Sequence, residues 1–454
     1  MGIVGPPRLL FDVTGLVAWY AFYPTPTGIQ RVTERLLMAP DIADNPQVLH
    51  VARVPGADAF FVIDRATIQG LGCKSSHAAS VRRIRRLYVS LLKQVPFLRG
   101  IQEMEWFQWK NVCRAWLGLG FLFDQGNSPS AADERPASLR DLDCTDVFIN
   151  LGDFWWYPRQ SRALAKLQAR YGFRIVQMVH DLFPLGSTTW EPSFFRRKFI
   201  EQLKGLVPLV DAWIVNSQFV AGELRRHLQE TGQPVRPIRI LRMGWERAVA
   251  RDRLAVEGDG EILRGLGLQE HGYFLQVGTI EPRKNHRAIV QAVETLRHKH
   301  GATLPVCVFA GVNGWGSSRL LRHLEKTRFA GGAIRWLSRI GDRELAALYR
   351  GALFTVYPSF LEGWGLPVQE SLSYGVPCIA SKAGAIPEAG LDLALYVDPA
   401  NQAEITEAIE CYATDPTALA LARSRIAVWL SGADKLPSWN DAARTVLELA
   451  TGRP

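Results

Sequence analysis

This sequence of 454 residues has no long apolar run and no signal peptide pattern. No stretch reaches the roughly 18 uninterrupted apolar residues that a membrane-spanning helix needs. In the N-terminal stretch MGIVGPPRLLFDVTG, Asp12 stands where the apolar core of a signal peptide would be. These absences predict a cytoplasmic protein.

Paired cysteine spacing is also missing. The six cysteines are scattered along the chain, several of them within apolar strand or helix patterns. This distribution predicts buried free thiols and argues against disulfides or a zinc site. The six are Cys73, Cys113, Cys144, Cys307, Cys378 and Cys411.

The net charge of +9 is concentrated in one segment. Residues 74–123 hold nine Lys and Arg against Glu103 and Glu105, a local charge of +7 that leaves +2 for the remainder. Around this segment, residues 65–135 combine arginines with apolar residues at helical spacing and with tryptophans, which predicts a basic helical insert. Two interpretations stay open: the insert binds an anionic membrane surface at the inner face of the plasma membrane, or it packs on the first domain with a solvated basic face. No reading module for nucleic acid accompanies the charge, so we expect no nucleic-acid partner.

Strand-like apolar runs alternate with helix-period segments in two series, the pattern of parallel sheets with crossover helices. The polar stretch at 246–261 separates the series. We therefore predict an α/β protein of two Rossmann-like domains, at 1–247 and 248–430, and a terminal helix within 431–454 that starts at Ser438. The expected strands are 8–13, 146–152, 173–181, 212–217 and 238–244 in the first series, and 273–278, 304–311, 334–341, 354–359 and 376–381 in the second.

Two segments in the first half of the chain lie where a loop meets the end of an expected helix or strand. Gly28 ends a Pro/Thr loop just before a helix, so unpaired amides and the helix dipole point over the loop. His180 follows an apolar strand at the edge where open α/β sheets bind ligands, and its imidazole can donate a hydrogen bond to a substrate. Each is weak evidence alone.

Two further segments, both in the second half, indicate an anion site. After Gly278, adjacent Arg283 and Lys284 open a helix, where both charges oppose the helix dipole and an anionic ligand such as a diphosphate would offset them. In EGWGLPVQE (362–370), glycines allow close backbone approach, and Pro367 suits a first helical turn. The amides of Trp364, Gly365 and Leu366 are therefore expected to bind an anion, and Glu370 to bind two vicinal hydroxyls.

These motifs resemble those of the retaining nucleotide-sugar glycosyltransferases of family GT4, in their bacterial polysaccharide branch. The matching motifs are PTGIQRV, VHDLFPL, VNSQFVAGEL, VGTIEPRKN, FAGVNGWGS, RIGDRELAALYRGA and PSFLEGWGLPVQESLSYGVPCIASKAGAIPE. The resemblance implies a GT-B fold: an N-terminal acceptor domain and a C-terminal donor domain facing each other across a cleft, and a terminal helix that crosses back.

The resemblance also implies roles for single residues. Glu370 would hold the donor ribose and Lys284 the diphosphate, while Gly28 would face the diphosphate from the other domain. His180 would contact the sugar, and Ile340 would lie beside the base. Glu362, with the amides of Gly363 to Leu366, would contact the transferred sugar and the diphosphate. Many members have Arg directly after the strand glycine, where this chain has Thr279, and we infer that Arg283 replaces it.

The reaction expected from this resemblance is sugar transfer with retention and without a metal cofactor. The donor is a nucleotide-diphosphate sugar, with GDP-mannose as first candidate, and the acceptor is a glycan or lipid-linked glycan. The sequence DLDC at 141–144 is interpreted as an ordinary polar loop, because it lies in the wrong domain for a metal-binding Asp-x-Asp. Two alternatives remain at this point: a nucleotide-sugar hydrolase or epimerase of GT-B fold, and an inactive glycan-binding protein.

Overall fold

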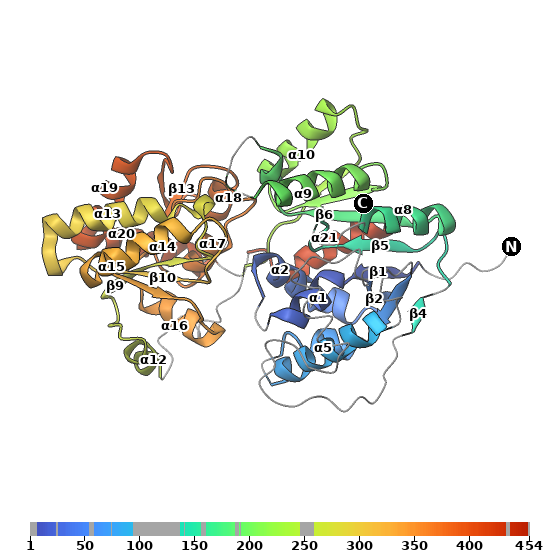
Figure 1. Ribbon diagram of the computed structural model, residues 1–454, viewed down its shortest axis with the longest axis horizontal. Helices are drawn as coiled ribbons and strands as arrows, with labels where there is room; N and C mark the ends of the chain where they lie inside the picture. Colours follow the sequence, from blue (N-terminus) through green and yellow to red (C-terminus); the bar gives the residue numbers. More distant parts are fainter. Residues whose placement is uncertain are drawn as a thin grey trace.

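Two β-sheets, one in each half of the chain, organise the structure (Figure 1). We call residues 7–245 the N-terminal domain and residues 258–432 the C-terminal domain. The boundary expected between residues 247 and 248 lies outside the described residues. The computed structural model describes residues 7–23, 26–53, 59–73, 75–93, 137–139, 141–155, 160–186, 190, 192–245, 258–432 and 436–452.

The N-terminal sheet has eight strands in the order β4-β3-β2-β1-β5-β6-β7-β8. Six of them run parallel, whereas β3 is antiparallel to both β2 and β4. The strands are β1 (Leu9–Asp12), β2 (Val48–Ala52), β3 (Phe60–Ile63), β4 (Ser138–Leu139), β5 (Val147–Asn150), β6 (Arg174–Val179), β7 (Ala212–Val215) and β8 (Ile238–Ile240).

The C-terminal sheet has six parallel strands in the order β11-β10-β9-β12-β13-β14. Numbered from β9, this is the 3-2-1-4-5-6 order of a Rossmann sheet, whose ligands bind at the carboxyl ends of the strands. The strands are β9 (Tyr273–Val277), β10 (Val306–Ala310), β11 (Ile334–Leu337), β12 (Thr355–Tyr357), β13 (Cys378–Ser381) and β14 (Leu395–Val397).

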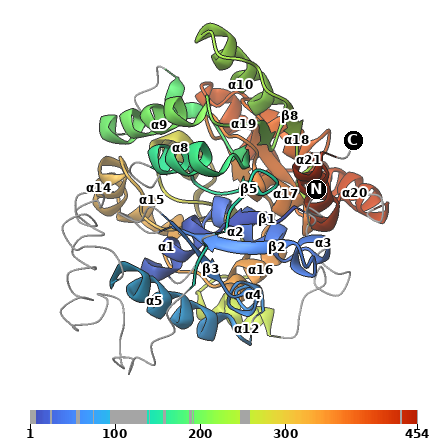
Figure 2. The same cartoon turned by 90° about the vertical axis from the view of Figure 1, so that its right-hand side faces the viewer.

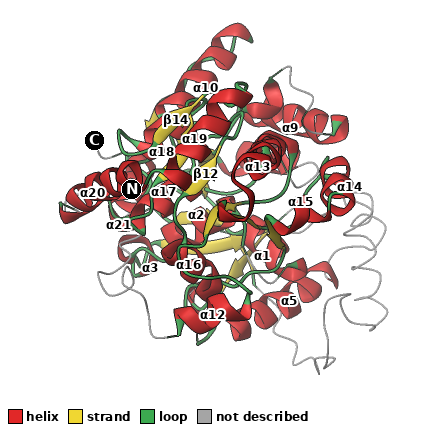
Figure 3. Cartoon of the chain, turned by 90° about the vertical axis from the view of Figure 1, so that its left-hand side faces the viewer, coloured by secondary structure: helices red, strands yellow, loops and turns green. Residues whose placement is uncertain are grey.

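Helices cover both faces of each sheet. Leu9 and Phe11 of β1 face a core shared with α1, α2 and α5, and Leu10 faces the core under α8, α9 and α10 (Figure 2). In the C-terminal domain, helices likewise surround the strands (Figure 3). The N-terminal helices are α1 (Thr14–Phe22), α2 (Gly28–Leu37), α3 (Pro40–Ala43), α4 (Arg65–Gln69), α5 (His77–Lys93), α8 (Gln160–Tyr171), η1 (Phe183–Leu185), α9 (Ser193–Leu206) and α10 (Gln218–Glu230). Those that follow are α12 (Asp259–Gly265), η2 (Pro282–Lys284), α13 (His286–His300), η3 (Gly301–Thr303), α14 (Ser318–Lys326), α15 (Arg328–Gly332), α16 (Asp342–Gly351), α17 (Leu366–Ser373), α18 (Ile386–Gly390), α19 (Gln402–Thr414), α20 (Pro416–Ser431) and α21 (Trp439–Thr451).

Each of the ten expected strands contains an observed strand, but four observed strands were not predicted. The strand β2 was missed because His50 interrupts its apolar run, although His50 is itself buried. Antiparallel β3 and β4, with four and two residues, and three-residue β14 give little periodic signal.

The last helix returns to the N-terminal domain, as expected for this fold. Ser438 caps α21 by accepting a hydrogen bond from the amide of Asp441 over 3.1 Å, so the predicted helix start is confirmed. Ala442, Ala443 and Val446 belong to the N-terminal core. In Figure 1, α21 accordingly lies among the N-terminal elements.

Helix α5 lies in the described part of the basic segment, and its packing bears on the two interpretations. Val81, Ile84 and Tyr88 are buried in the N-terminal core, while Arg82 and Arg86 are exposed. The apolar face of α5 is therefore used in packing, which favours the packed insert over a membrane-bound helix. Residues 94–136 of the segment lie outside the described residues. None of the described helices is long and apolar enough to cross a membrane.

The described cysteines are free, as predicted, but not all of them are buried. All five cysteines among the described residues are free. Cys307 and Cys378 are buried, but Cys73, Cys144 and Cys411 are exposed, so burial was wrong for these three. Cys113 lies outside the described residues.

A buried histidine gives a testable dependence of stability on pH. His286 packs edge-on against Phe309, and burial lowers its pKa to about 3. Since the unfolded chain binds this proton below about pH 6.5 and the folded chain does not, the folded state loses stability as pH falls. We expect the stability of His286→Leu relative to the wild type to rise by about 3 kcal/mol between pH 7 and pH 4, measured by urea unfolding.

The matched control is His298→Leu, which removes an exposed histidine from the same helix. This control should keep the pH dependence of the wild type. Equal pH dependence of His286→Leu and the wild type would show that His286 is not held neutral.

Candidate active site

The carboxyl ends of the two sheets meet where His180, after β6, contacts Gly363, in the loop after β12. A Cβ atom on Gly363 would lie 1.9 Å from the carbonyl oxygen of His180 and 2.9 Å from Cβ of Asp181. Such distances are far shorter than van der Waals contact, so only glycine fits here. Two of the segments selected from the sequence are therefore in direct contact across the domains.

Glu362 is the centre of a buried ion-pair cluster next to this contact. Its Oε2 lies 2.6 Å from Nη1 of Arg283, and its Oε1 lies 2.9 Å from Nζ of Lys284. The hydroxyl of Tyr357 donates to Oε1 over 2.9 Å. Burial alone would raise the pKa of Glu362, but the two cations outweigh it and lower the pKa to about 2. Glu362 is therefore ionised at neutral pH.

Arg283 is surrounded by protein groups. Its Nη2 lies 2.5 Å from Oε1 of Glu281, and its Nη1 donates to the carbonyl of Leu361 over 2.7 Å as well as pairing with Glu362. The guanidinium also lies 4.6 Å from the ring centroid of Phe183, which belongs to the other domain. Glu281 and Glu362 thus offset the positive charge that an anionic ligand was expected to offset. A diphosphate contact of Arg283 stays a prediction, and these partners favour a role in positioning Glu362.

Lys284 lies against the glycine that ends β9. Gly278 has φ of 144°, and a Cβ atom there would lie 3.0 Å from Cδ of Lys284. The Nζ of Lys284 donates to the hydroxyl of Tyr357 over 2.7 Å. The lysine is thus held with its ammonium beside Glu362, at the carboxyl edge of the sheet.

The loop before α17 has the backbone that was expected for an anion site. Gly365 has φ of 143° and precedes the helix, and Pro367 lies in its first turn. Among the described residues, the amides of Trp364, Gly365 and Leu366 donate to no protein acceptor. They are available to an anion at the start of α17.

The same loop touches the N-terminal domain at Gly28, where α2 begins. A Cβ atom on Gly28 would lie 3.6 Å from Cδ1 of Leu366. The side chains of Trp364 and Leu366 pack against the N-terminal core, and the indole nitrogen of Trp364 donates to Gln369 over 2.9 Å. Gly28 therefore faces the loop from the other domain.

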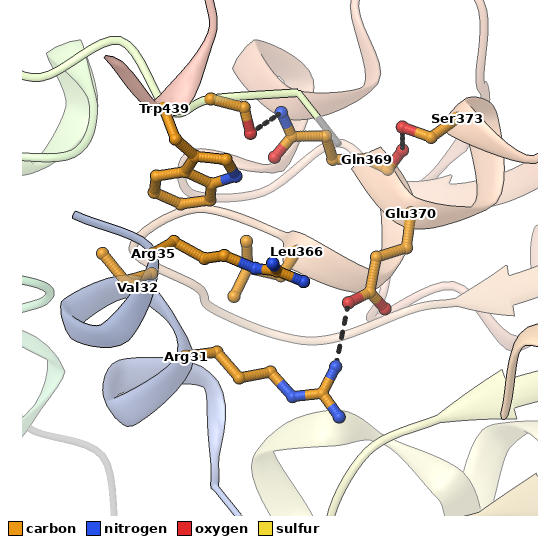
Figure 4. Close-up of a pocket in the computed structure, with 9 residues that line it drawn as sticks. Arg31, Val32, Arg35, Leu366, Gln369, Glu370, Ser373 and Trp439 are labelled. Atoms are coloured by element: carbon orange, nitrogen blue, oxygen red, sulfur yellow. Dashed lines mark hydrogen bonds and ion pairs between the residues drawn. The ribbon is translucent and has the colours of Figure 1, made fainter. Parts of the chain in front are cut away.

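Glu370 projects from α17 into a pocket between the domains (Figure 4). Its Oε2 accepts a hydrogen bond from the hydroxyl of Tyr349 over 2.7 Å, and its Oε1 lies 3.7 Å from Nη1 of Arg31. Arg31 also pairs with Asp342 of α16 over 2.8 Å. Helix α2 thus supplies an arginine to a glutamate of the C-terminal domain.

His180 differs from the expectation that it donates a hydrogen bond to a substrate. Its Nε2 donates to the carbonyl of Leu151 over 2.8 Å, because a carbonyl oxygen can only accept. Burial lowers the pKa of His180 to about 4, so the ring is neutral and its Nδ1 is an acceptor. His180 can therefore accept a hydrogen bond from a hydroxyl, but its one proton is already used.

Ile340 follows β11 and is half-buried against the C-terminal core. Its expected position beside a base stays a prediction. The DLDC stretch forms a turn in which Asp143 Oδ1 accepts from the amide of Thr145 over 2.7 Å. No group of three metal-ligating side chains occurs in the described part of the chain.

Sequence reasoning missed the role of Glu388 in the motif GAIPE. Its two carboxylate oxygens accept hydrogen bonds from the amides of Gln218 and Phe219, over 2.7 and 2.8 Å. These amides begin α10 in the N-terminal domain, so a carboxylate of one domain caps a helix of the other. Both motifs were recognised in the sequence, but nothing there shows that they touch.

Comparison with known proteins bears on this geometry. Residues 261–426 match the profile of the family described as Glycosyl transferases group 1. The C-terminal domain belongs to this family. Its match includes Lys284, Glu362 and Glu370, so the cluster described above lies within the glycosyltransferase domain.

The matches to curated relatives cover only part of the length of those relatives. The O-antigen chain mannosyltransferase B of Escherichia coli is 40% identical over 139 residues, which cover 30% of this chain and 36% of that protein. The serotype-specific mannosyltransferase WbdA of Escherichia coli is 26% identical over 282 residues, which cover 60% and 33%. The chain spans about a third of the length of these relatives.

Solved glycosyltransferase structures match nearly the whole chain. Anabaena Alr3699/HepE, in complex with UDP and glucose, has a TM-score of 0.60 at 12% identity and covers 98% of this chain and 100% of its own. Sucrose-phosphate synthase from Thermosynechococcus elongatus has a TM-score of 0.59 at 16% identity and covers 98% of both chains. These likenesses confirm the expected GT-B fold.

Proposed function

We propose that this protein transfers a sugar from a nucleotide-diphosphate sugar to a glycan or lipid-linked glycan acceptor in bacterial polysaccharide synthesis. The observation that carries the proposal is that Lys284, which follows β9, pairs with Glu362 on the loop after β12, and that the unpaired amides of Trp364 to Leu366 lie on the same loop as Glu362. The names of the mannosyltransferase relatives support GDP-mannose as donor. HepE was solved with UDP, so uridine diphosphate sugars are the donors to compare with GDP-mannose.

The leaving nucleoside diphosphate is the group that most needs stabilisation during transfer. The ammonium of Lys284 and the amides at the start of α17 place positive charge there in advance of the reaction. The chain thus supplies the charge that a metal would provide, which supports transfer without one. In our proposal Glu370, which accepts a hydrogen bond from Tyr349, also accepts hydrogen bonds from the ribose hydroxyls.

Retention by front-face displacement is supported by the state of Glu362. A nucleophile that forms a glycosyl-enzyme needs a free carboxylate oxygen, whereas both oxygens of Glu362 are paired with cations. Its low pKa also makes it a weak base. In our proposal the acceptor oxygen attacks the anomeric carbon from the side of the leaving phosphate, whose oxygen takes the acceptor proton.

Replacing Lys284 by Ala tests this proposal. Loss of a charge-assisted contact should weaken donor binding by about 1.5–3 kcal/mol, or roughly 10- to 150-fold in Kd. Isothermal titration with GDP-mannose, UDP-glucose and UDP measures the change, and sugar transfer should fall with it.

The control is Lys382→Ala, which removes an exposed lysine paired with Asp398 in the same domain. It should bind the donor like the wild type. Unchanged donor affinity in Lys284→Ala would remove this lysine from the site, and absence of donor binding by the wild type would contradict the proposed function.

A further inference from the structure

A small pocket at the carboxyl edge of the N-terminal sheet holds a carboxylate to which no role has been given. Asp153 follows β5, two residues after Leu151, whose carbonyl accepts the His180 hydrogen bond. The pocket is lined by residues of the ends of β1 and β5, of α1 and of the first turns of α2, namely Asp12, Gly15, Leu16, Ile29, Gln30, Thr33, Gly152 and Asp153. It therefore adjoins the surface where His180 meets Gly363.

Among the described residues, one oxygen of Asp153 has a hydrogen-bond donor and the other has none. The amide of Gln30 donates to its Oδ2 over 2.9 Å. Its Oδ1 is shielded from solvent and, among the described residues, has no hydrogen-bond partner. A buried carboxylate oxygen without a donor is costly to the folded state, so it calls for a reason.

Asp12, which lines the same pocket, has a hydrogen-bond donor for each of its carboxylate oxygens. Its Oδ1 accepts from the amide of Thr14 over 2.9 Å, and its Oδ2 accepts from Gln160 over 3.0 Å. Asp12 thus ties β1 to α1 and α8. The two aspartates share an environment but differ in that Asp153 keeps one acceptor position open.

Burial also raises the pKa of Asp153 to about 7, and the hydrogen bond from Gln30 lowers it by less. The described titratable groups near the pocket are Asp12, Arg53, whose charge lowers the pKa of Asp12, and His180, which is neutral. No cation among the described residues contributes to the raised pKa of Asp153. Perturbed and incompletely paired groups of this kind concentrate at functional sites.

We propose that Asp153 binds the acceptor, with its Oδ1 accepting a hydrogen bond from the acceptor hydroxyl that receives the sugar. This rests on the proposed transfer reaction and names the acceptor side of the same site. The ligand class is a sugar hydroxyl, which is a donor that can fill the open position of the carboxylate. During transfer the bond between the hydroxyl oxygen and the anomeric carbon forms, the bond from that carbon to the phosphate oxygen breaks, and the phosphate oxygen takes the proton. Asp153 orients the hydroxyl and is unchanged.

Asp153→Asn tests the proposal through transfer and stability together. With methyl α-mannoside as acceptor and GDP-mannose as donor, the variant should raise the KM for the acceptor at least tenfold and leave the Kd of the donor unchanged. Because the amide is neutral, the variant should also melt higher than the wild type at pH 8, where Asp153 is ionised, and by a smaller margin at pH 5.

Asp12→Asn is the matched control. It places an amide where both oxygens already accept, so it should melt lower than the wild type. A wild-type acceptor KM in Asp153→Asn, or a melting temperature as low as that of Asp12→Asn, would overturn the acceptor role. A wild type that binds no donor would instead contradict the proposed function, and the melting comparison still decides whether Asp153 is a structural group.

Discussion

Replacing Gly363 by Ala is expected to reduce sugar transfer by about 100-fold while both domains stay folded. The new Cβ atom would lie 1.9 Å from the His180 carbonyl oxygen, which is backbone and cannot rotate away. The two domains must then separate locally by roughly 1 Å or more, since close-packed surfaces have no space to absorb a methyl group. A displacement of this size between donor and acceptor groups is enough to lose most of the rate.

The experiment compares kcat, donor Kd and the radius of gyration by small-angle scattering. We expect kcat to fall and the radius to increase, with a smaller change in donor affinity because Lys284 and Glu370 stay in one domain. Gly222→Ala is the control, since a Cβ atom at Gly222 in α10 meets nothing within 4 Å. Wild-type kcat in Gly363→Ala would mean that the contact with His180 is not needed for transfer.

The closed arrangement tested by this variant depends on several contacts across the domains. Phe183 lies over Arg283, and the rings of Trp190 and Phe360 stack with centroids 5.5 Å apart. Glu388 caps α10, and Arg31 reaches Glu370. Each pair joins an N-terminal group to a loop or helix of the C-terminal domain near the proposed donor site, so we expect domain closure and donor geometry to be coupled.

The sequence predicts single residues of this site better than it predicts their partners. Lys284, Glu362 and Glu370 could be selected because each lies in a local pattern: a strand end, a glycine loop or a helix start. Arg31 and Asp153 lie in ordinary helix and loop patterns, so they carry no local signal. Each of them contacts a residue more than 100 positions away in the sequence, and only the fold shows that the two residues are close.

The same limit explains why single side-chain contacts differ from those that the sequence suggests. The sequence places Arg283 and Lys284 side by side, which suggests that both face an anion. The fold turns Arg283 toward Glu281 and Glu362 and leaves Lys284 beside the loop. It also points the one ring proton of His180 at a carbonyl of the neighbouring strand end. Strand periodicity could be predicted because it repeats, whereas these contacts depend on the orientation of single side chains.

Glu362→Ala should cause a large loss of stability together with a loss of transfer. Removing one member of a buried ion pair leaves the other charge uncompensated, at a cost of about 3–5 kcal/mol. Here Lys284 loses its carboxylate partner outright, while Arg283 keeps Glu281. Urea unfolding at pH 7 measures the loss.

Glu370→Ala provides the comparison, because Glu370 is less buried than Glu362 and its ion pair with Arg31 is longer, at 3.7 Å. Its stability loss should be clearly smaller. In the wild type, the contribution of Glu362 is present above pH 4.5 and is lost as pH falls toward its folded pKa of about 2. Glu362→Ala should therefore lack this part of the acid dependence.

A nucleoside diphosphate separates the structural role of Glu362 from its place in the donor site. If Lys284 binds the diphosphate, a saturating diphosphate supplies the anion that Glu362→Ala lacks. The ligand should then raise the melting temperature of Glu362→Ala more than that of Glu362→Ala combined with Lys284→Ala. Equal increases would show that the diphosphate does not use Lys284. Wild-type stability of Glu362→Ala would mean that the cluster does not hold the loop together.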